Sequence, residues 1–417
     1  MSNWPVQTQG GEVNSVATSG SGYVVVAGTY YHDGPHVPAT LGTYAYDAGG
    51  ALLWQDSAPP KTGTQGVVKD QGVYWVAVSR DGQWAASAGG DHAVPLPSAP
   101  GVGTVTAYEM STCTSTTILN AQIGGVNMVA LSGNGGYLVA GADATYVFER
   151  TGSTFGTPVV LRDQIAATDS VVAVAISDDG KWVIYGTTAG KVVLYATTGA
   201  LSAPVAWTAA PNHYVKMVAM AAGGKGFAVV TTNRQFAKKN GTPVECHAYF
   251  FNLDSSQPND FPTTQSPTTM WTLNGCDGVM SVAINADGSR VAAVANVKQT
   301  TGTSGIVFFF DALSTTPIWV KPTLHGPNSV STDDAGKQVA VADGFLSPGA
   351  FYLFDVYGAS VPINGLQANQ PGVVSWSIQL SADGKALVAG SDDAKVYYFG
   401  VAPATAPAAP TNVRIVT

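Results

Sequence analysis

The sequence predicts an all-β chain in which one small antiparallel sheet is repeated around a ring, and three observations lead to this prediction. A polar turn that contains glycine, written SDDGKW at residues 177–182, recurs in close variants along the 417 residues. Short apolar runs rich in Val, Ile, Tyr and Phe flank each turn, as buried strands do. No stretch shows the periodicity of an amphipathic helix. The predicted fold is an eight-bladed β-propeller of four-stranded antiparallel blades, with seven blades as the alternative.

The turn glycines set the period of the repeat. Successive ones are 44 to 64 residues apart, which suits units of four strands. They are Gly22, Gly82, Gly135, Gly180, Gly224, Gly288, Gly336 and Gly384. We expect blades to begin near residues 12, 72, 125, 170, 214, 278, 327 and 374.

The strands of one unit follow a fixed order, as in SVVAVAIS (170–177), WVIYGT (182–187), KVVLYAT (191–197) and PVAWTAA (204–210). One such sheet cannot bury both of its faces, so radial stacking is expected. The last unit has only three runs, within 375–401, and the strand-like segment 3–9 can complete it. The propeller domain is therefore predicted to span 1–401.

The repeats resemble those of two propeller families. The VAxSxDG pattern at the turns resembles WD40-like repeats, whereas AYDAGGALLW (45–54) and FFDALSTTPIW (309–319) resemble the PQQ-type repeat of eight-bladed quinoprotein-type propellers. The second resemblance implies that the tryptophan of the repeat packs one blade on the next. The tryptophans that would have this role are Trp4, Trp54, Trp207, Trp271 and Trp319.

The PQQ-type resemblance also raises the question of a quinone cofactor. Enzymes of that class are expected to offer an adjacent Cys-Cys pair, a calcium site and a catalytic aspartate near the channel. The three cysteines here are far apart, and the channel residues predicted below include no aspartate. We therefore do not expect PQQ. Haem-attachment, nucleophile-elbow, P-loop and EF-hand motifs are also missing from the sequence, which favours a protein that is not an enzyme.

Composition narrows the partners and the compartment. Charged residues make up 11%, the formal net charge is −8, and 19 Lys and Arg are scattered along the chain, which argues against nucleic-acid binding. No apolar run is long enough to span a bilayer. An uncharged surface rich in Ser, Thr and Gly is more usual in secreted, periplasmic or cell-surface proteins than in cytoplasmic ones. The first residues resemble no signal peptide, so an exported chain would have lost it.

One face of the predicted ring carries the repeated turns, and we call it the turn face. The links from second to third strands lie on the opposite, link face, and four are long: 29–42, 89–103, 231–245 and 296–305. Long insertions on one face of a repeat protein usually mark its binding face. The favoured function is thus an exported bacterial binding module, a monomer with a protein or carbohydrate ligand on the link face.

Histidines in these links suggest a metal site as the basis of an alternative function. His32 and His36 lie in the first link, and Asp91 and His92 lie in the second. Imidazole and carboxylate groups from neighbouring blades could together bind a divalent transition metal. The alternative is that these side chains are simply exposed. A metal- or quinone-dependent oxidoreductase with its site at the channel mouth is therefore the second hypothesis.

The mouth of the central channel should be lined by residues near the start of each first strand. Asparagine, tyrosine and tryptophan there suit hydrogen bonding and stacking on a small polar ligand or sugar, and Lys216 is the only cation. The alternative is a water-filled mouth. The eight positions are Asn14, Tyr74, Asn127, Val172, Lys216, Met280, Asn328 and Trp376, of which all but Val172 and Met280 are candidate ligand-binding residues.

The cysteines and the tail complete the predictions. Cys246 and Cys276 lie at equivalent ends of a predicted hairpin, so they can form a disulfide or remain free, and Cys113 stays unpaired. The segment 402–417 is rich in Pro and Ala, like a linker. Its end, APTNVRIV, resembles the first strand of a fibronectin type III domain. The third functional hypothesis follows from this tail: a structural spacer of a larger surface protein.

Overall fold

A computed structural model describes most of the chain. The described residues are 4–8, 10–32, 40–63, 66–67, 70–91, 101–162, 165, 169–198, 203–234, 243–254, 260–299, 302–344, 349–361 and 375–400. They form antiparallel strands and one four-residue helix, α2 (Phe261–Thr264). None of the described helical structure is long and apolar enough to cross a membrane. The tail 402–417 lies outside the described residues.

The first half of the chain forms sheets that we number as blades 1 to 4. Blade 1 consists of β2 (Glu12–Thr18), β3 (Val24–Tyr31), β4 (Leu41–Asp47) and β5 (Leu52–Ala58). Blade 2 consists of β8 (Gln71–Val78), β9 (Trp84–Asp91), β10 (Val102–Glu109) and β11 (Thr114–Gln122), and β8 also pairs with the end of β3, so blades 1 and 2 share one sheet. Blade 3 consists of β12 (Met128–Leu131), β13 (Tyr137–Gly141), β14 (Thr145–Thr151), β15 (Thr154–Phe155) and β16 (Val159–Leu161). Blade 4 consists of β17 (Val171–Ile176), β18 (Trp182–Thr187), β19 (Lys191–Ala196) and β20 (Val205–Thr208). The short β6 (Thr62–Gly63) and β7 (Gly66–Val67) pair with each other.

The second half forms blades 5 to 8. Blade 5 consists of β21 (Tyr214–Met220), β22 (Gly226–Thr232), β23 (Cys246–Asn252) and β24 (Thr269–Thr272). Blade 6 consists of β25 (Gly278–Ile284), β26 (Arg290–Gln299), β27 (Gly302–Asp311) and β28 (Pro317–Thr323). Blade 7 consists of β29 (Pro327–Thr332), β30 (Gln338–Asp343) and β31 (Ala350–Asp355). Blade 8 consists of β32 (Ser375–Leu380), β33 (Ala386–Ser391), β34 (Lys395–Gly400) and β1 (Val6–Gln7).

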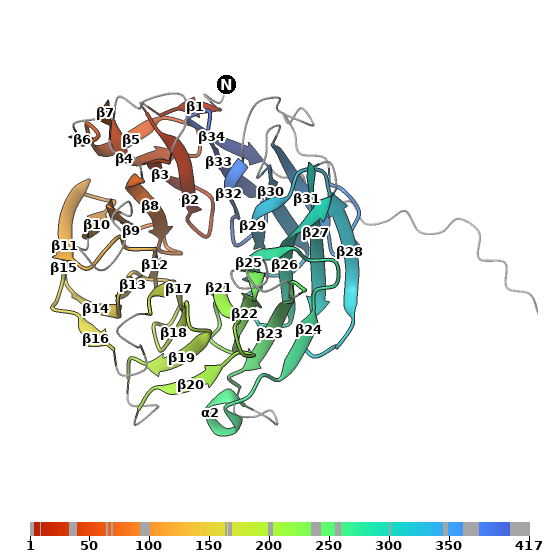
Figure 1. Ribbon diagram of the computed structural model, residues 1–417. Helices are drawn as coiled ribbons and strands as arrows, with labels where there is room; N and C mark the ends of the chain where they lie inside the picture. The colour runs from red at the N-terminus through yellow and green to blue at the C-terminus, as the bar shows by residue number, and fades with distance from the viewer. Residues whose placement is uncertain are drawn as a thin grey trace, which may run out of the picture.

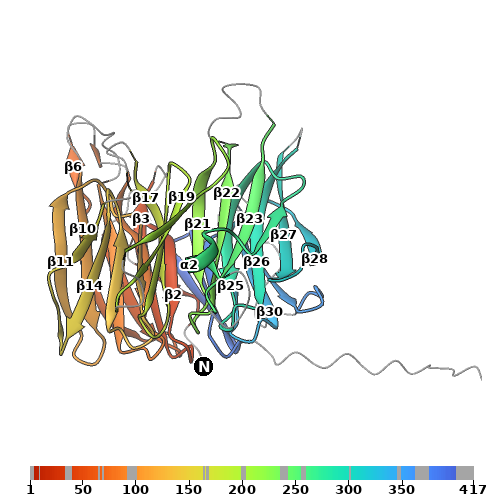
Figure 2. The same cartoon turned by 90° about the horizontal axis from the view of Figure 1, so that it is seen from below.

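The innermost strands close a ring around a central axis (Figure 1). In chain order β2, β8, β12, β17, β21, β25, β29 and β32 each contact the next, and β32 contacts β2. At the closure, Val6 of β1 pairs with Val396 of β34, so an N-terminal strand completes the last sheet. Figure 2 shows the sheets side by side, with their strands running between the two faces. The predicted all-β propeller is confirmed, and among the described residues the inner strands follow the order of the predicted units; the number of eight blades stays a prediction.

The repeated turn has a local cause that is clear at residues 177–182. The Ser177 hydroxyl donates to Asp179 Oδ1 (2.6 Å) and accepts the N–H of Trp182 (3.0 Å), while Asp179 Oδ1 accepts the N–H of Lys181 (2.9 Å). Gly180 has a φ of +73° and donates its N–H to the Ser177 carbonyl (2.9 Å). Serine, aspartate and glycine therefore recur because each satisfies or permits one feature of this backbone.

The eight turns are also bonded to one another. Each turn donates or accepts a backbone hydrogen bond with the turn of the next blade, and the series closes on itself at 2.8 to 3.2 Å. The N–H to carbonyl bonds are Gly20 to Arg80, Asp81 to Gly133, Gly133 to Asp178, Asp178 to Ala222, Gly223 to Ala286, Ala286 to Asp334, Asp334 to Ala382 and Ala382 to Gly20. The turn face thus has a continuous ring of backbone bonds.

Arg80 adds a side-chain connection at the same end of the channel. Its guanidinium pairs with Asp178 of blade 4 and with Asp334 of blade 7, where one Nη2 to Oδ1 distance is 2.9 Å. All three side chains line a cavity of about 390 Å³ together with residues of the inner strands. Arg80 therefore links three blades where the channel reaches the turn face.

The predicted tryptophans all lie against the following blade. Three of them donate their indole N–H to a backbone carbonyl there: Trp4 to Ala48 (2.8 Å), Trp271 to Ser314 (2.6 Å) and Trp319 to Val356 (3.1 Å). Trp54 stacks on Tyr108 of blade 2, and Trp207 contacts Tyr249 of blade 5. These contacts help to bury the outer parts of the sheets.

One of the four long links differs from its prediction. Residues 296–305 are predicted as a loop, yet β26 and β27 continue their pairing as far as Gln299↔Gly302. This link is an extension of a hairpin, because its Val, Lys and Thr residues continue the ladder instead of leaving it. The central parts of the other three links, 33–39, 92–100 and 235–242, lie outside the described residues.

Candidate functional site: the channel mouth

The predicted channel residues share one backbone feature. In seven inner strands the pairing register with the second strand shifts at the channel residue, and Asn127 lies directly before β12. The shifts fall between Val13/Ser15, Val73/Trp75, Val171/Ala173, Val215/Met217, Val279/Ser281, Pro327/Ser329 and Ser375/Ser377. An extra residue in one strand leaves the ladder and changes the direction of its side chain. The irregularity therefore recurs where the channel opens on the link face.

These residues surround a single cavity of about 400 Å³. All eight positions predicted from the register line it: Asn14, Tyr74, Asn127, Val172, Lys216, Met280, Asn328 and Trp376. The register prediction did not include other lining residues, among them His32, Thr188 and Tyr214. His32 and Thr188 follow the ends of second strands, so a first-strand register could not identify them. That a ligand occupies this cavity stays a prediction.

The asparagine side chains brace neighbouring blades. Each donates from Nδ2 to a backbone carbonyl of the next blade: Asn14 to Tyr74 (2.6 Å), Asn127 to Val171 (2.8 Å) and Asn328 to Ser375 (2.8 Å). These bonds hold the amides in one orientation. The asparagines thus have a structural role at the mouth besides the ligand contact predicted from their chemistry.

His32 belongs to the mouth through several contacts. Its ring stacks on Trp376 with centroids 5.1 Å apart, and its Nε2 lies 3.1 Å from Asn14 Oδ1. Its Nδ1 lies 3.7 Å from Asp70 Oδ1. Burial lowers the pKa of His32, and the charge of Asp70 opposes this shift. A neutral ring packed on the tryptophan is the expected state at neutral pH.

The metal group predicted from the histidines of the first two links can be followed only in part. Of that group, His32 alone has a described side chain; His36 and His92 lie outside the described residues, and Asp91 is described only as the end of β9. The described acidic neighbours of His32 are Asp70 and Glu12, 3.7 Å from its ring nitrogens. Whether the predicted group assembles stays a prediction.

Lys216 is the one lysine or arginine among the residues that line the cavity. Within the described part of the chain no hydrogen bond or ion pair forms at its ammonium group. Burial lowers the pKa of Lys216, and the nearby positive charge of Arg234 lowers it further. Arg234 itself lies 3.6 Å from a carboxylate oxygen of Asp277. Lys216 is therefore a cation that an anionic group entering the cavity would stabilise.

Two other polar atoms at the mouth are buried without a hydrogen-bond partner among the described residues. They are Nε1 of Trp376 and Oδ1 of Asn328, on neighbouring blades. A buried polar atom without a partner costs about 1–3 kcal/mol, and such atoms in native structures often belong to functional sites. Among the described residues, the mouth therefore combines a lysine without a counter-ion and polar groups that are not fully satisfied.

Two of the three cysteines lie at the link-face end of blade 5. Cys246, at the start of β23, and Cys276, after β24, form a disulfide with their Cα atoms 6.1 Å apart. The bond joins the third and fourth strands beside the long link. Cys113 is exposed and has a free thiol.

Comparison with known proteins supports the architecture. No protein-family model matches the chain, and no curated protein matches its sequence. The solved Dos1 propeller is 13% identical with a TM-score of 0.65, over 95% of this chain and 94% of that chain. Sqt1 of Chaetomium thermophilum, solved bound to the N-terminus of the ribosomal protein L10, is 15% identical with a TM-score of 0.64, over 95% and 98%. The PQQ-type resemblance stays a prediction. At these identities the likeness shows the fold alone, and that fold is the β-propeller.

Proposed function

We propose that this propeller is a non-catalytic interaction module that binds an acidic segment of a protein partner at the channel mouth. The observation that carries the proposal is Lys216, a half-buried lysine that lines a cavity of about 400 Å³ and has no anionic partner among the described residues. A carboxylate of the partner would pair with this ammonium group and offset its desolvation. The cavity volume suits a few side chains of an extended segment.

A protein partner is favoured over a carbohydrate by the state of the aromatic rings. Sugars bind best on an open aromatic face, whereas Trp376 is stacked on His32 at 5.1 Å. Sqt1, which has a similar fold, was solved with the N-terminus of a ribosomal protein bound, and this supports a protein partner for the present propeller. The proposal includes a monomer in an exported location, and the disulfide Cys246–Cys276 supports an oxidising compartment.

The test is a selection from an unbiased library of displayed 12-residue peptides, followed by fluorescence anisotropy with the enriched peptides. We expect enrichment of Asp and Glu. Lys216→Met should weaken binding by about 10–100-fold, the range for a hydrogen bond to a charged group. Lys385→Met is the matched control, because Lys385 lies next to the turn of blade 8 with its side chain 79% exposed.

The salt dependence distinguishes the proposed contact from non-specific attraction. Wild-type affinity should fall as NaCl increases, and the affinity of the Lys216→Met variant should fall less. Enrichment of peptides that lack acidic residues would contradict the proposal. Equal affinities of the Lys216→Met and Lys385→Met variants for the enriched peptides would also contradict it. Enrichment of acidic peptides that bind both variants equally would place the contact elsewhere on the surface.

A further inference from the structure

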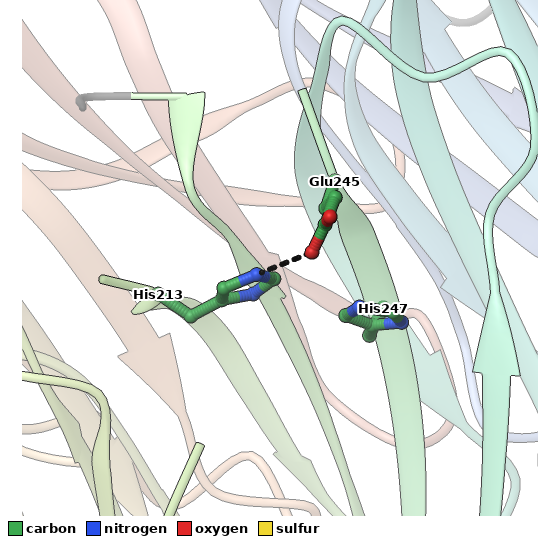
Figure 3. A group of neighbouring side chains, drawn as sticks. All are labelled: His213, Glu245 and His247. Atoms are coloured by element: carbon green, nitrogen blue, oxygen red, sulfur yellow. Dashed lines mark ion pairs between the residues drawn. The ribbon is translucent and has the colours of Figure 1, made fainter. Parts of the chain in front are cut away.

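Three potential metal ligands meet in blade 5, and they are not the group predicted from the first two links. His213 directly precedes β21, Glu245 directly precedes β23, and His247 is the second residue of β23 (Figure 3). One ligand atom from each of the three side chains lies within 4.8 Å of the others. His213 is 32 and 34 positions from Glu245 and His247 in the chain, and the sheet brings it to them.

His213 is held with one ring nitrogen toward Glu245. Its side chain is 1% exposed, and its Nδ1 lies 3.1 Å from the Thr231 hydroxyl. Its Nε2 lies 3.5 Å from Glu245 Oε2, and this nitrogen is buried without a hydrogen bond among the described residues. In Figure 3 the imidazole points at the carboxylate. A hydrogen bond at the second nitrogen is how proteins commonly orient a metal-binding histidine.

The β-sheet register places His247 beside this pair. Thr231 of β22 pairs with His247, so the hydroxyl that holds His213 comes from the strand next to His247. The two imidazoles stack with centroids 5.1 Å apart and an angle of 25° between the rings. Nδ1 of His247 is also buried without a hydrogen bond among the described residues. Two imidazoles thus have buried nitrogens that nothing in the described protein satisfies.

The charge states suit metal binding. Burial lowers the pKa of His213 and of His247, and Glu245 only partly opposes this. Neutral imidazoles can give their lone pairs to a metal without first losing a proton. Glu245 has 56% of its side chain exposed, which leaves a route for an ion and room for water.

We propose that His213, Glu245 and His247 form a site for a divalent transition-metal ion, with Zn²⁺ as the best fit. Two imidazoles, one carboxylate and a water molecule are a ligand set that zinc accepts. With zinc–ligand bonds of about 2.0–2.2 Å, tetrahedral ligand atoms lie about 3.3 Å apart, close to the 3.5 Å between His213 Nε2 and Glu245 Oε2. Because the rings are now stacked, His247 must turn about its Cβ–Cγ bond to direct a nitrogen at the ion.

The proposal is independent of the function proposed for the channel mouth, since it involves neither Lys216 nor a protein partner. Such an ion would join the segment before β21 to the start of β23, next to the disulfide of Cys246. It would hold the link-face end of blade 5 in one arrangement. The site is thus expected to stabilise the folded chain.

The direct test is isothermal titration of the whole chain with ZnCl₂ after removal of metals by chelator and dialysis. We expect one Zn²⁺ per chain, and at least a tenfold weaker affinity for both Glu245→Gln and His247→Gln. Glu245 is largely exposed, so its substitution should leave the fold intact; circular dichroism checks this. His325→Gln is the matched control, because His325 lies before β29 and outside this group, and the variant should bind zinc like the wild type.

A second measurement gives the geometry. Co²⁺ in place of Zn²⁺ should give the intense visible absorption of a four-coordinate site, and this absorption should be lost in His247→Gln. Failure of the wild type to bind Zn²⁺ at 10 μM free metal, or unchanged affinity in both variants, would overturn the proposal. Loss of binding in His32→Gln alone would also overturn it and favour the site predicted from the first two links.

Discussion

The two ends of the central channel are built in opposite ways. At the turn face each blade contributes the same kind of turn, the backbones bond in a closed ring, and the Arg80 guanidinium pairs with two carboxylates. At the mouth the side chains differ from blade to blade, from Val172 to Lys216 to Trp376. Lys216 has no counter-ion among the described residues there.

This difference shows which residue positions of a repeat protein can vary in sequence. A turn that must bond to its neighbours on both sides tolerates few residue types, because its backbone is the same in each blade. The residue at the register shift has left the ladder, so its side chain is less constrained by strand pairing. Sequence similarity among blades therefore marks the scaffold, and differences among blades mark the candidate site.

The largest effect is expected for a turn glycine. Gly180→Ala forces alanine into a φ of +73° and places its Cβ 2.5 Å from Cδ2 of Tyr137. We expect a loss of about 2–4 kcal/mol in the free energy of unfolding, measured by urea denaturation. Gly152→Ala is the matched control, with a φ of +64° and nothing within 4 Å of the added Cβ. This variant should lose about 1–2 kcal/mol in the free energy of unfolding. Equal losses in the two variants would mean that the close approach of the added Cβ to Tyr137 of the neighbouring blade has no effect on stability.

A smaller loss of stability is expected when the Arg80 side chain, which connects three blades at the turn face, is replaced. Arg80→Met leaves Asp178 and Asp334 without their shared cation, and we expect a loss of about 1 kcal/mol at pH 7. Burial raises the pKa of Asp178 while Arg80 lowers it, so the substitution raises this pKa further. The loss should therefore decrease as the pH falls and Asp178 becomes neutral. Urea denaturation at several pH values measures this; a loss that does not vary with pH would contradict the ionic explanation.

The control for this charge effect is Arg162→Met. Arg162 forms an ion pair with Asp143 and donates a hydrogen bond to the Tyr146 hydroxyl (3.5 Å), and its side chain is 58% exposed. An exposed pair of this kind contributes little, so we expect a change within about 0.5 kcal/mol. A loss as large as that of Arg80→Met would show that connection of three blades gives no extra stability.

An effect of the opposite sign is expected at the mouth. The folded-state pKa of Lys216 lies below its ordinary value of 10.5. Between these two pKa values the unfolded chain binds more protons, so stability rises with pH in this window, and burial of Lys216 costs stability at lower pH. Lys216→Met should raise the free energy of unfolding at pH 7 by about 0.5–2 kcal/mol. Urea denaturation at pH 7 and pH 10 should show a smaller gain in the free energy of unfolding at pH 10. A variant that is less stable than the wild type at pH 7 would contradict the prediction.

Much of the mouth was predictable because its residues lie at a constant place in each repeat. Asn14, Lys216 and Trp376 each precede a turn by a short strand, and the turn is recognisable in the sequence. Arg80 was not predicted as a link between blades, since its partners come from blades 4 and 7.

The group in blade 5 shows a second limit of the sequence. Glu245 and His247 are two residues apart, so their side chains lie on one side of a strand, and this signal could have identified them as a pair. Nothing in the sequence indicates that His213 joins them, because this contact depends on the pairing of β22 with β23. The loop predicted at 296–305 was wrong for a related reason: strand pairing extends β26 and β27 into this segment.

By itself, the sequence determined the all-β class, the period of the repeat, the turns and the ring of channel positions. These features follow from local requirements, such as a glycine at positive φ and apolar residues in short runs. The same requirements occur in each repeat. Only the tertiary structure decided that Arg80 connects three blades, that His32 stacks on Trp376 and that His213 meets Glu245 and His247. The physical reason is that such contacts join residues distant in the chain, and their distances depend on how the blades and their strands pack together.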